Sequence, residues 1–174
     1  MTANYVVDNT HSTVSFTARH LVFTKVRGRF ADWKADLYLD EDLTKSRVAV
    51  EIDVASIATG VDKRDEHLRS ADFFEVEKFP KLTFVSKRIE PGKGDHFKII
   101  GDLTIRDVTR EVVLDAEKTG SGKDPWGGER VAFTAATHVD RSDYGLRWNV
   151  VLEAGGVTVS DRIEIEIEIQ AIKQ

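Results

Sequence analysis

Hydrophobic and polar positions alternate along most of this chain. The clearest case is Arg162–Gln170, where isoleucine stands at every second position and three glutamates stand between. A period of two predicts β-strands that bury one face and expose the other. The same alternation recurs in six other runs, around Val14–Ala18, Val48–Val54, Leu82–Phe84, Ile99–Ile105, Val112–Leu114 and Val131–Ala135.

The spacing of these runs predicts the fold class. About eight strands at hairpin spacing, with one short helix inserted, predict an all-β, antiparallel barrel in a single domain of residues 1–174. Within Val26–Leu39 the apolar positions change parity after Phe30, which predicts a β-bulge. Turn-forming residues separate the strands at Asp40–Asp42, Pro91–Asp95, Arg106–Asp107, Gly120–Gly128 (the one long loop expected) and Gly155–Gly156.

The segment from Ala58 to Ser86 interrupts the strand pattern. Thr59 and Asp62 are candidate helix N-caps, and Asp65 would complete an approximate capping box with Asp62. The expected helix of two or three turns faces inward with Leu68 and Ala71. It leaves four charged residues for water or for a partner: Asp62, Lys63, Glu66 and Arg69. Phe73, Phe74 and Phe79 follow before Pro80, and a helix flanked by aromatic residues beside a sheet predicts a lid.

The interior of such a barrel is either hollow or filled with side chains. The inward positions mix large residues with small ones, namely Ala18, Gly28, Ala35, Gly101 and Ala135. Small residues leave room along the barrel axis for a slender ligand. They are equally compatible with a solid core in which neighbouring aromatic rings fill the space, so the composition leaves both interiors open.

Several segments resemble one protein family. These are RDEHLRSADFF followed by FPKLTFVS, VDNTHSTVSFTARHLVFTKVRGRF, GDLTIRDVTREVVL and DRSDYGLRWNVVLEAGGVTVSDRIEI, which in chain order cover nearly the whole sequence. They are similar to the YceI-like family of polyisoprenoid-binding proteins. The resemblance implies an up-and-down, lipocalin-like barrel and favours a hollow interior. It also implies a long-chain isoprenoid amphiphile as ligand, such as a polyprenyl phosphate or an isoprenoid quinone.

Two loops depart from the family pattern. Arg106 and Asp107 stand where the family reads His-Gly, and Asp140-Arg141 with Asp143-Tyr144-Gly145 stand in place of an Asn-Arg pair and an Asp-Phe-Gly motif. These changes alter turn geometry and any head-group role of the two loops, while the fold implied by the resemblance is unaffected.

The expected ligand-binding residues line the lumen, with His20 and Arg64 near its polar end. The full set is Phe16, His20, Phe30, Val50, Ile52, Arg64, Leu68, Phe73, Phe74, Phe84, Leu103, Phe133 and Trp148. Counting in twos from Val14 places His20 on the inward face, where it either donates to a ligand oxygen or is satisfied by a backbone carbonyl at the rim. His67 either orients a head group or pins the helix to the barrel.

Composition excludes several kinds of function. Without cysteine there is no disulfide or thiol chemistry, and the histidines show no metal-binding spacing, so no metal or cofactor is expected. A net charge of −5 without long charged blocks gives no concentrated basic face for nucleic acid. The sequence contains no run of about 18 apolar residues, the length needed to span a membrane. The start at Met1 lacks the features of a signal peptide, which favours a cytoplasmic location.

The function expected is non-catalytic binding, sequestration or transport of the isoprenoid amphiphile in the barrel lumen. One alternative is an enzyme that acts on such a lipid with His20 or His67 as general acid or base. The other is a solid-cored, stress-related interaction protein. A homodimer would cover the apolar rim beside the lid and is a further expectation.

Overall fold

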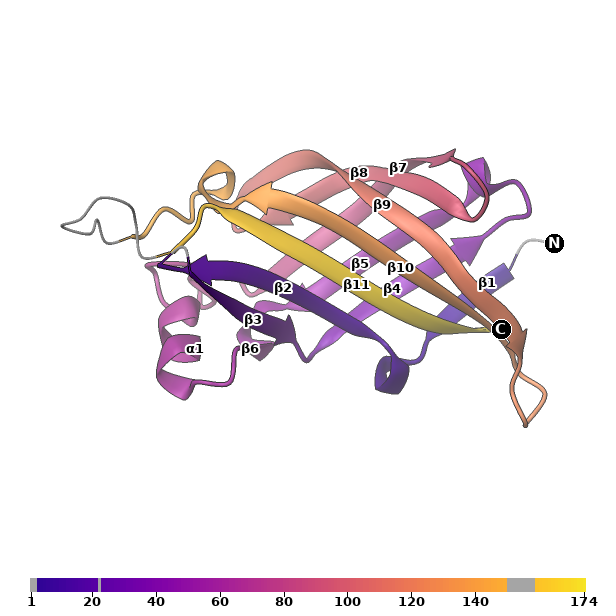
Figure 1. The fold of residues 1–174 in the computed structure, drawn as a ribbon, viewed down its shortest axis with the longest axis horizontal. Coiled ribbons are helices and arrows are strands. Elements are labelled where there is room, and N and C mark those ends of the chain that lie inside the picture. Colours follow the sequence, from indigo (N-terminus) through magenta and orange to yellow (C-terminus); the bar gives the residue numbers. More distant parts are fainter. Residues whose placement is uncertain (1–2, 22, 150–158) are drawn as a thin grey trace.

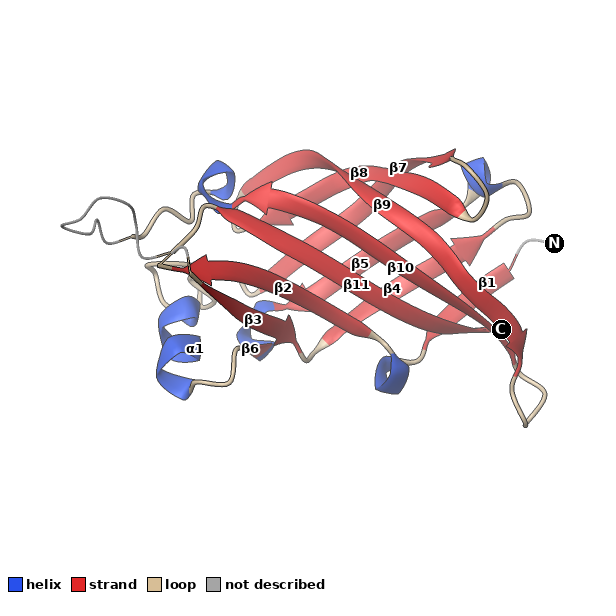
Figure 2. Ribbon diagram, in the orientation of Figure 1, coloured by secondary structure: helices blue, strands red, loops and turns tan. Residues whose placement is uncertain are grey.

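The computed structural model describes residues 3–21, 23–149 and 159–174, and within them the chain is mostly β-strand. The single α-helix is α1 (Asp62–Arg69), and short 3-10 turns lie at Asn9–His11, Leu43–Lys45, Val54–Ser56 and Arg141–Tyr144 (Figure 2). The strands are β1 (Ala3–Val7), β2 (Thr13–His20), β3 (Thr24–Phe30), β4 (Trp33–Leu39), β5 (Arg47–Asp53), β6 (Ile57–Ala58), β7 (Lys81–Pro91), β8 (His96–Ile105), β9 (Val108–Lys123), β10 (Glu129–Asp140) and β11 (Arg162–Lys173). The predicted turn at Gly155–Gly156 lies outside the described residues.

The strands form a closed antiparallel barrel (Figure 1). The ring runs β1-β4-β5-β7-β8-β9-β10-β11 and closes because β11 pairs with β1. The sheet continues from the first half of β11 through β2, β3 and β6. β2 follows β1, β3 precedes β4 and β6 follows β5, each across a short break, so each pair is one interrupted long strand. Followed along the chain, eight long strands pair with their neighbours in order, which confirms the predicted up-and-down barrel.

The prediction of a β-bulge within Val26–Leu39 is wrong, because this stretch is broken into two strands. β3 ends at Phe30 and β4 begins at Trp33. Between them the backbone is held by bonds to the neighbouring break, from the Ala31 amide to the Ser56 carbonyl and from the Asp53 amide to the Asp32 carbonyl. The backbone changes direction across this break, so that Phe30 and Trp33 are both buried, which explains the change of apolar parity in the sequence.

The long loop predicted at Gly120–Gly128 is also shorter than expected. β9 extends to Lys123, and its register with β10 shifts between Ala132 and Phe133. The remaining turn is built around the Asp124 carboxylate, which accepts hydrogen bonds from the Trp126 and Gly128 amides at 2.9 and 2.8 Å. An aspartate that caps its own turn allows the ladder to continue through glycine-rich sequence.

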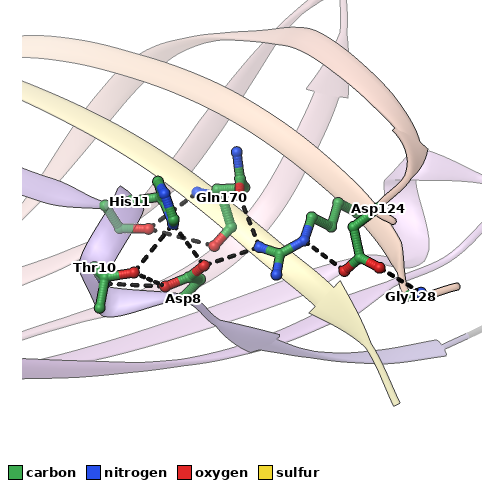
Figure 3. A network of polar contacts seen from close by, with 8 residues as sticks. Asp8, Thr10, His11, Asp124, Gly128 and Gln170 are labelled. Atoms are coloured by element: carbon green, nitrogen blue, oxygen red, sulfur yellow. Dashed lines mark hydrogen bonds and ion pairs between the residues drawn. The ribbon is translucent and has the colours of Figure 1, made fainter. Parts of the chain in front are cut away.

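A polar network fastens the break between β1 and β2 to this turn (Figure 3). Arg130 donates at 2.8 Å to the carboxylates of Asp8 and Asp124 and to the Gln170 side-chain oxygen. Hydrogen bonds from Thr10, Arg130 and His11 hold the pKa of Asp8 far below its usual range. The pKa of Asp124 is lowered in the same way, chiefly by Arg130.

Helix α1 covers the side of the barrel where β6 is an edge strand. β6 pairs only with β3, while β7 pairs with β5 on the other side of the gap. The segment after α1 returns to the barrel through bonds from the Phe74 amide to the Leu68 carbonyl and from the Val54 amide to the Pro80 carbonyl. A covering helix protects the exposed ladder of such an edge, so the short helix expected from the sequence is present, and its action as a lid stays a prediction.

The details of α1 differ from the prediction. Its N-cap is Val61 and makes no side-chain capping bond, so the proposed cap residues are wrong. Asp65 is buried and accepts from the Thr59 amide and hydroxyl at 2.9 and 2.6 Å. Ala71 is exposed, and Arg69 donates to the Ala55 carbonyl at 3.0 Å. In the described residues, no helix is long and apolar enough to cross a membrane.

Candidate functional site

The barrel encloses an apolar cavity of about 250 Å³. Its lining reaches along β11 from Ile163 to Ile169, a span of about 20 Å at the usual rise of a strand. One end is bounded by Leu43 and Arg47, and the other lies near Phe73 and Arg141 beside the lid. The interior is therefore hollow along part of the barrel axis, which favours the first of the two interiors expected from the sequence.

Ten of the thirteen expected site residues line this cavity. They are Phe16, Phe30, Val50, Ile52, Leu68, Phe73, Phe74, Phe84, Leu103 and Phe133. Ala18 and Ala135 also line it, as expected from their small size. Contact of these residues with a ligand stays a prediction.

The small residues do not all contribute empty space. A Cβ on Gly28 would lie 2.3 Å from Cζ of Phe16, and one on Gly101 would lie 2.6 Å from Cζ of Phe84. Each glycine thus lets an aromatic ring lie against the barrel wall. At these two positions the sequence pattern that indicated room for a ligand is explained by aromatic packing instead.

Aromatic rings gather at the lid end of the cavity. The ring centres of Phe16 and Phe30 are 5.5 Å apart, and those of Phe30 and Phe74 are 6.2 Å apart in an edge-to-face arrangement. Phe74 comes from the segment after α1, so this cluster joins the lid to the β2–β3 wall. Movement of Phe74 would lengthen the cavity toward the lid.

Trp148 was expected in the lumen but is not a lining residue of the cavity. Its ring centre lies 4.6 Å from that of His67 and 5.4 Å from that of Phe73. His67 is also outside the lining, and its Nε2 lies 2.8 Å from the Asp72 carboxylate. Trp148 and His67 therefore pack behind Phe73, an arrangement that favours the pinning role considered for His67.

His20 lies at the exposed end of β2 and does not line the cavity. The regular β2–β11 ladder ends at the pair Thr17 and Glu164, and beyond it β2 pairs with β3 and, through an isolated bridge at His20, with Val159. Alternation correctly places Ala18 inward. It fails for His20, which is the last residue of β2, lies beyond the regular ladder with β11 and is exposed.

Arg64, expected near the polar end of the lumen, is engaged elsewhere. Its Nε and Nη2 donate at 2.7 Å to the hydroxyl and the carbonyl of Thr59. Together with Asp65, it fixes the segment that precedes α1. Arg64 is not a lining residue of the cavity.

Arg141 is the cationic residue that sequence reasoning missed. It is 7% exposed and lines the cavity near the lid. Its guanidinium donates to the carbonyls of Ser160, Leu146, Trp148 and, at 3.4 Å, Val159. Burial lowers the pKa of Arg141, and the charge of Asp161 partly opposes this effect. An arginine remains protonated in proteins, so the cavity has a buried positive charge at this end.

The sequence contained one signal for this residue. Arg141 belongs to the segment Asp140–Gly145 that carried part of the family resemblance, but its side chain follows a strand and enters a 3-10 turn, so alternation gave no direction for it. Among the described residues, no group of three or more His, Asp or Glu side chains could hold a metal ion.

Known proteins resemble this chain over most of its length. A sequence profile described as the YceI-like domain matches residues 5–171. The chain belongs to the YceI-like family. A UPF0312 protein of Vibrio parahaemolyticus is 31% identical over 99% of this chain and 88% of its own length. A UPF0312 protein of Photorhabdus laumondii is 37% identical over 84% of this chain and 78% of its own length.

Several solved structures have the same barrel. The YceI protein of Campylobacter jejuni is 32% identical, with a TM-score of 0.76 over 90% of each chain. Burkholderia cenocepacia BcnA has a TM-score of 0.82 over 94% of this chain and 98% of its own, at 23% identity. A polyisoprenoid binding domain from Saccharophagus degradans has a TM-score of 0.67 over the whole of both chains, at 15% identity. The last two show the shared fold.

Proposed function

We propose that this YceI-like protein binds a long-chain isoprenoid amphiphile, such as a polyprenyl phosphate or an isoprenoid quinone, and carries or sequesters it without catalysis. The observation that carries the proposal is the apolar cavity along the barrel, which has one buried cation at its lid end. The family and the Saccharophagus domain described as polyisoprenoid binding support this ligand class.

The energetics assign different roles to the two parts of the ligand. Burial of about ten methylene equivalents of the tail contributes about 8 kcal/mol, at about 0.8 kcal/mol per group. One charged hydrogen bond to the head group adds about 1.5–3 kcal/mol. The tail therefore sets most of the affinity, and the head group sets the orientation.

Arg141 orients the head group toward the lid. Four hydrogen bonds to carbonyls leave one of the five N–H groups of a guanidinium for a ligand. The nearby Asp161 carboxylate is itself bonded to the Ser142 amide and hydroxyl. Carbonyl dipoles do not neutralise the cation, so a phosphate or a quinone oxygen fits at this end.

The present cavity would admit part of a long tail. A volume of about 250 Å³ exceeds the roughly 150 Å³ cavity that accommodates benzene, and it lies just below the roughly 300–1,000 Å³ of ordinary ligand sites. A longer tail requires rearrangement of lining side chains. Phe74 is placed for this movement, because it belongs to the lid segment and not to the barrel wall.

Calorimetric titration of delipidated protein tests the proposal. A polyprenyl phosphate and an isoprenoid quinone should bind with a negative heat-capacity change, as expected for apolar burial. A short-chain phosphate with the same head group should bind far more weakly. Equal binding of the short-chain phosphate, or no binding of either long-chain lipid, would contradict the proposal.

A further inference from the structure

The β2–β3 hairpin is locally basic in an acidic protein. Residues Ser12–Phe30 contain four Lys or Arg side chains and no Asp or Glu, whereas the chain as a whole carries a net charge of −5. The inward side chains Phe16 and Ala18 line the cavity. The outward face presents the four cations, all exposed, which are Arg19, Lys25, Arg27 and Arg29.

These cations are placed at a cost to the fold. Arg19 stands directly opposite Lys25 in the β2–β3 ladder, and like charges in such a pair destabilise a sheet. Within residues 3–21, 23–149 and 159–174, no carboxylate forms an ion pair with any of the four cations. An unbalanced cluster of this kind is complementary to an anionic surface outside the molecule.

An aromatic residue stands beside the cations at the hairpin tip. Phe23 is 87% exposed, and Lys25 follows about 7 Å further along the strand. The acidic outer face of β11, formed by Glu164, Glu166 and Glu168, begins two strands from β3, a separation of about 10 Å. That acidic face opposes a flat approach of the barrel wall to an anionic surface, so the tip is the favoured point of contact.

The opposite end of the barrel provides a comparison. Trp126, in the β9–β10 turn, is 85% exposed, and this turn lies at the far end of the barrel from the β2–β3 tip (Figure 1). There the cation Arg130 is paired with Asp8 and Asp124, and Lys173 is paired with Glu129. An exposed aromatic residue therefore occurs at both ends. Among the described residues, the one at the β2–β3 tip stands beside two cations, Arg19 and Lys25, for which there is no ion pair.

We propose that the β2–β3 tip docks onto an anionic lipid bilayer. Phe23 enters the interfacial layer, while Arg19 and Lys25 meet lipid phosphates. The tip is also linked to the lid end of the cavity, because the Ser160 amide donates to the Arg19 carbonyl and the Ser160 carbonyl accepts from Arg141. Docking would place the lid end of the cavity at the membrane, where an amphiphile could enter tail first.

Vesicle flotation of the full chain tests the proposal. The protein should float with vesicles of phosphatidylglycerol and phosphatidylcholine, but not with vesicles of phosphatidylcholine alone, and added salt should weaken the association. Arg19→Glu with Lys25→Glu should lower the partition constant at least about 25-fold, because loss of each cation costs about fivefold and each added carboxylate is repelled as well. This double variant keeps a like-charge pair in the ladder, so the fold should tolerate it. Phe23→Ser should lower the constant at least about tenfold.

Matched controls come from the far hairpin. Trp126→Ser and Lys123→Glu should float like the parent protein. Equal losses in these controls, flotation independent of lipid charge, or no flotation at all would overturn the proposal. Preferential binding of a single-stranded oligonucleotide over anionic vesicles would overturn it as well. Titration of the same variants with polyprenyl phosphate in the absence of vesicles should be unchanged, which separates this proposal from that of the cavity ligand.

Discussion

The guanidinium of Arg141 lies 5.8 Å from the ring centre of Phe73. Arg141 follows β10, whereas Phe73 belongs to the segment after α1, so this contact joins the lid to the C-terminal half of the chain. The same guanidinium binds the carbonyls of Leu146 and Trp148. One buried cation thus holds together the parts that form the lid end of the cavity.

Replacement of Arg141 should therefore destabilise the protein. Arg141→Ala leaves buried carbonyls without donors and should lower the free energy of unfolding by about 3 kcal/mol or more. Arg141→Lys keeps the charge but cannot reproduce the planar fork, and it should recover only part of the loss. Urea unfolding measures both effects. Arg147→Ala, at an exposed neighbour, should stay within about 0.5 kcal/mol of the parent, and a similar loss there would contradict the role assigned to Arg141.

Filling the cavity should block ligand uptake. Ala18 lines the cavity from β2, so Ala18→Phe should abolish binding of a polyprenyl phosphate in calorimetry while the protein still folds. In a filled core the same change would mainly cost stability, typically about 1–3 kcal/mol. Ala49→Phe is a matched control, since Ala49 lies on β5 outside the cavity lining. Normal binding by Ala18→Phe would show that the cavity is not the site.

Two glycines should differ in their tolerance of alanine. A Cβ at Gly101 would lie 2.5 Å from the Val85 carbonyl oxygen, which is backbone, and 2.6 Å from the Phe84 ring. The atoms nearest to a Cβ at Gly28 are all at the tip of the Phe16 ring, which can turn into the cavity. Gly101→Ala should therefore lower the thermal midpoint more than Gly28→Ala, with a cost in the range of about 1–3 kcal/mol or above. The reverse order would show that the Phe16 ring is fixed.

Acid should weaken the ion pairs of Arg130 with Asp8 and Asp124. The carboxyls of Asp8 and Asp124 have pKa values lowered by Arg130 and neighbouring donors. Their contribution to stability is complete above the ordinary value of 3.8 and is lost as the pH falls below it toward the lowered values. Urea midpoints near pH 7 and about pH 3 should differ less in Arg130→Met than in the parent. An unchanged difference would show that other carboxyls dominate acid unfolding.

Much of the barrel could be predicted from the sequence because alternation reports which strand face is buried. The nearly uninterrupted pattern around Ile163–Ile169 is a direct consequence of a wall with one apolar face. The breaks in the strands were harder to predict from the sequence. The break between Phe30 and Trp33 is stabilised by backbone hydrogen bonds with Ser56 and Asp53, which are distant in sequence. No local sequence pattern indicates such partners.

The polar part of the site was harder to predict than its apolar lining. Aromatic and branched residues on inward strand positions line the cavity as expected, since their direction follows from parity. His20 lies where a strand ends, Arg64 lies in α1 and Trp148 lies in a loop, and strand parity carries no information at these places. Arg141 was missed for the opposite reason: it is buried, whereas a charged residue after a strand is ordinarily exposed.

Organic extraction of the protein purified from its own host, followed by mass spectrometry, tests the central claim most directly. The account predicts a long-chain isoprenoid amphiphile in roughly stoichiometric amount, and its absence from an extract of the Ala18→Phe variant. A well-folded parent protein that yields no such lipid would contradict the account.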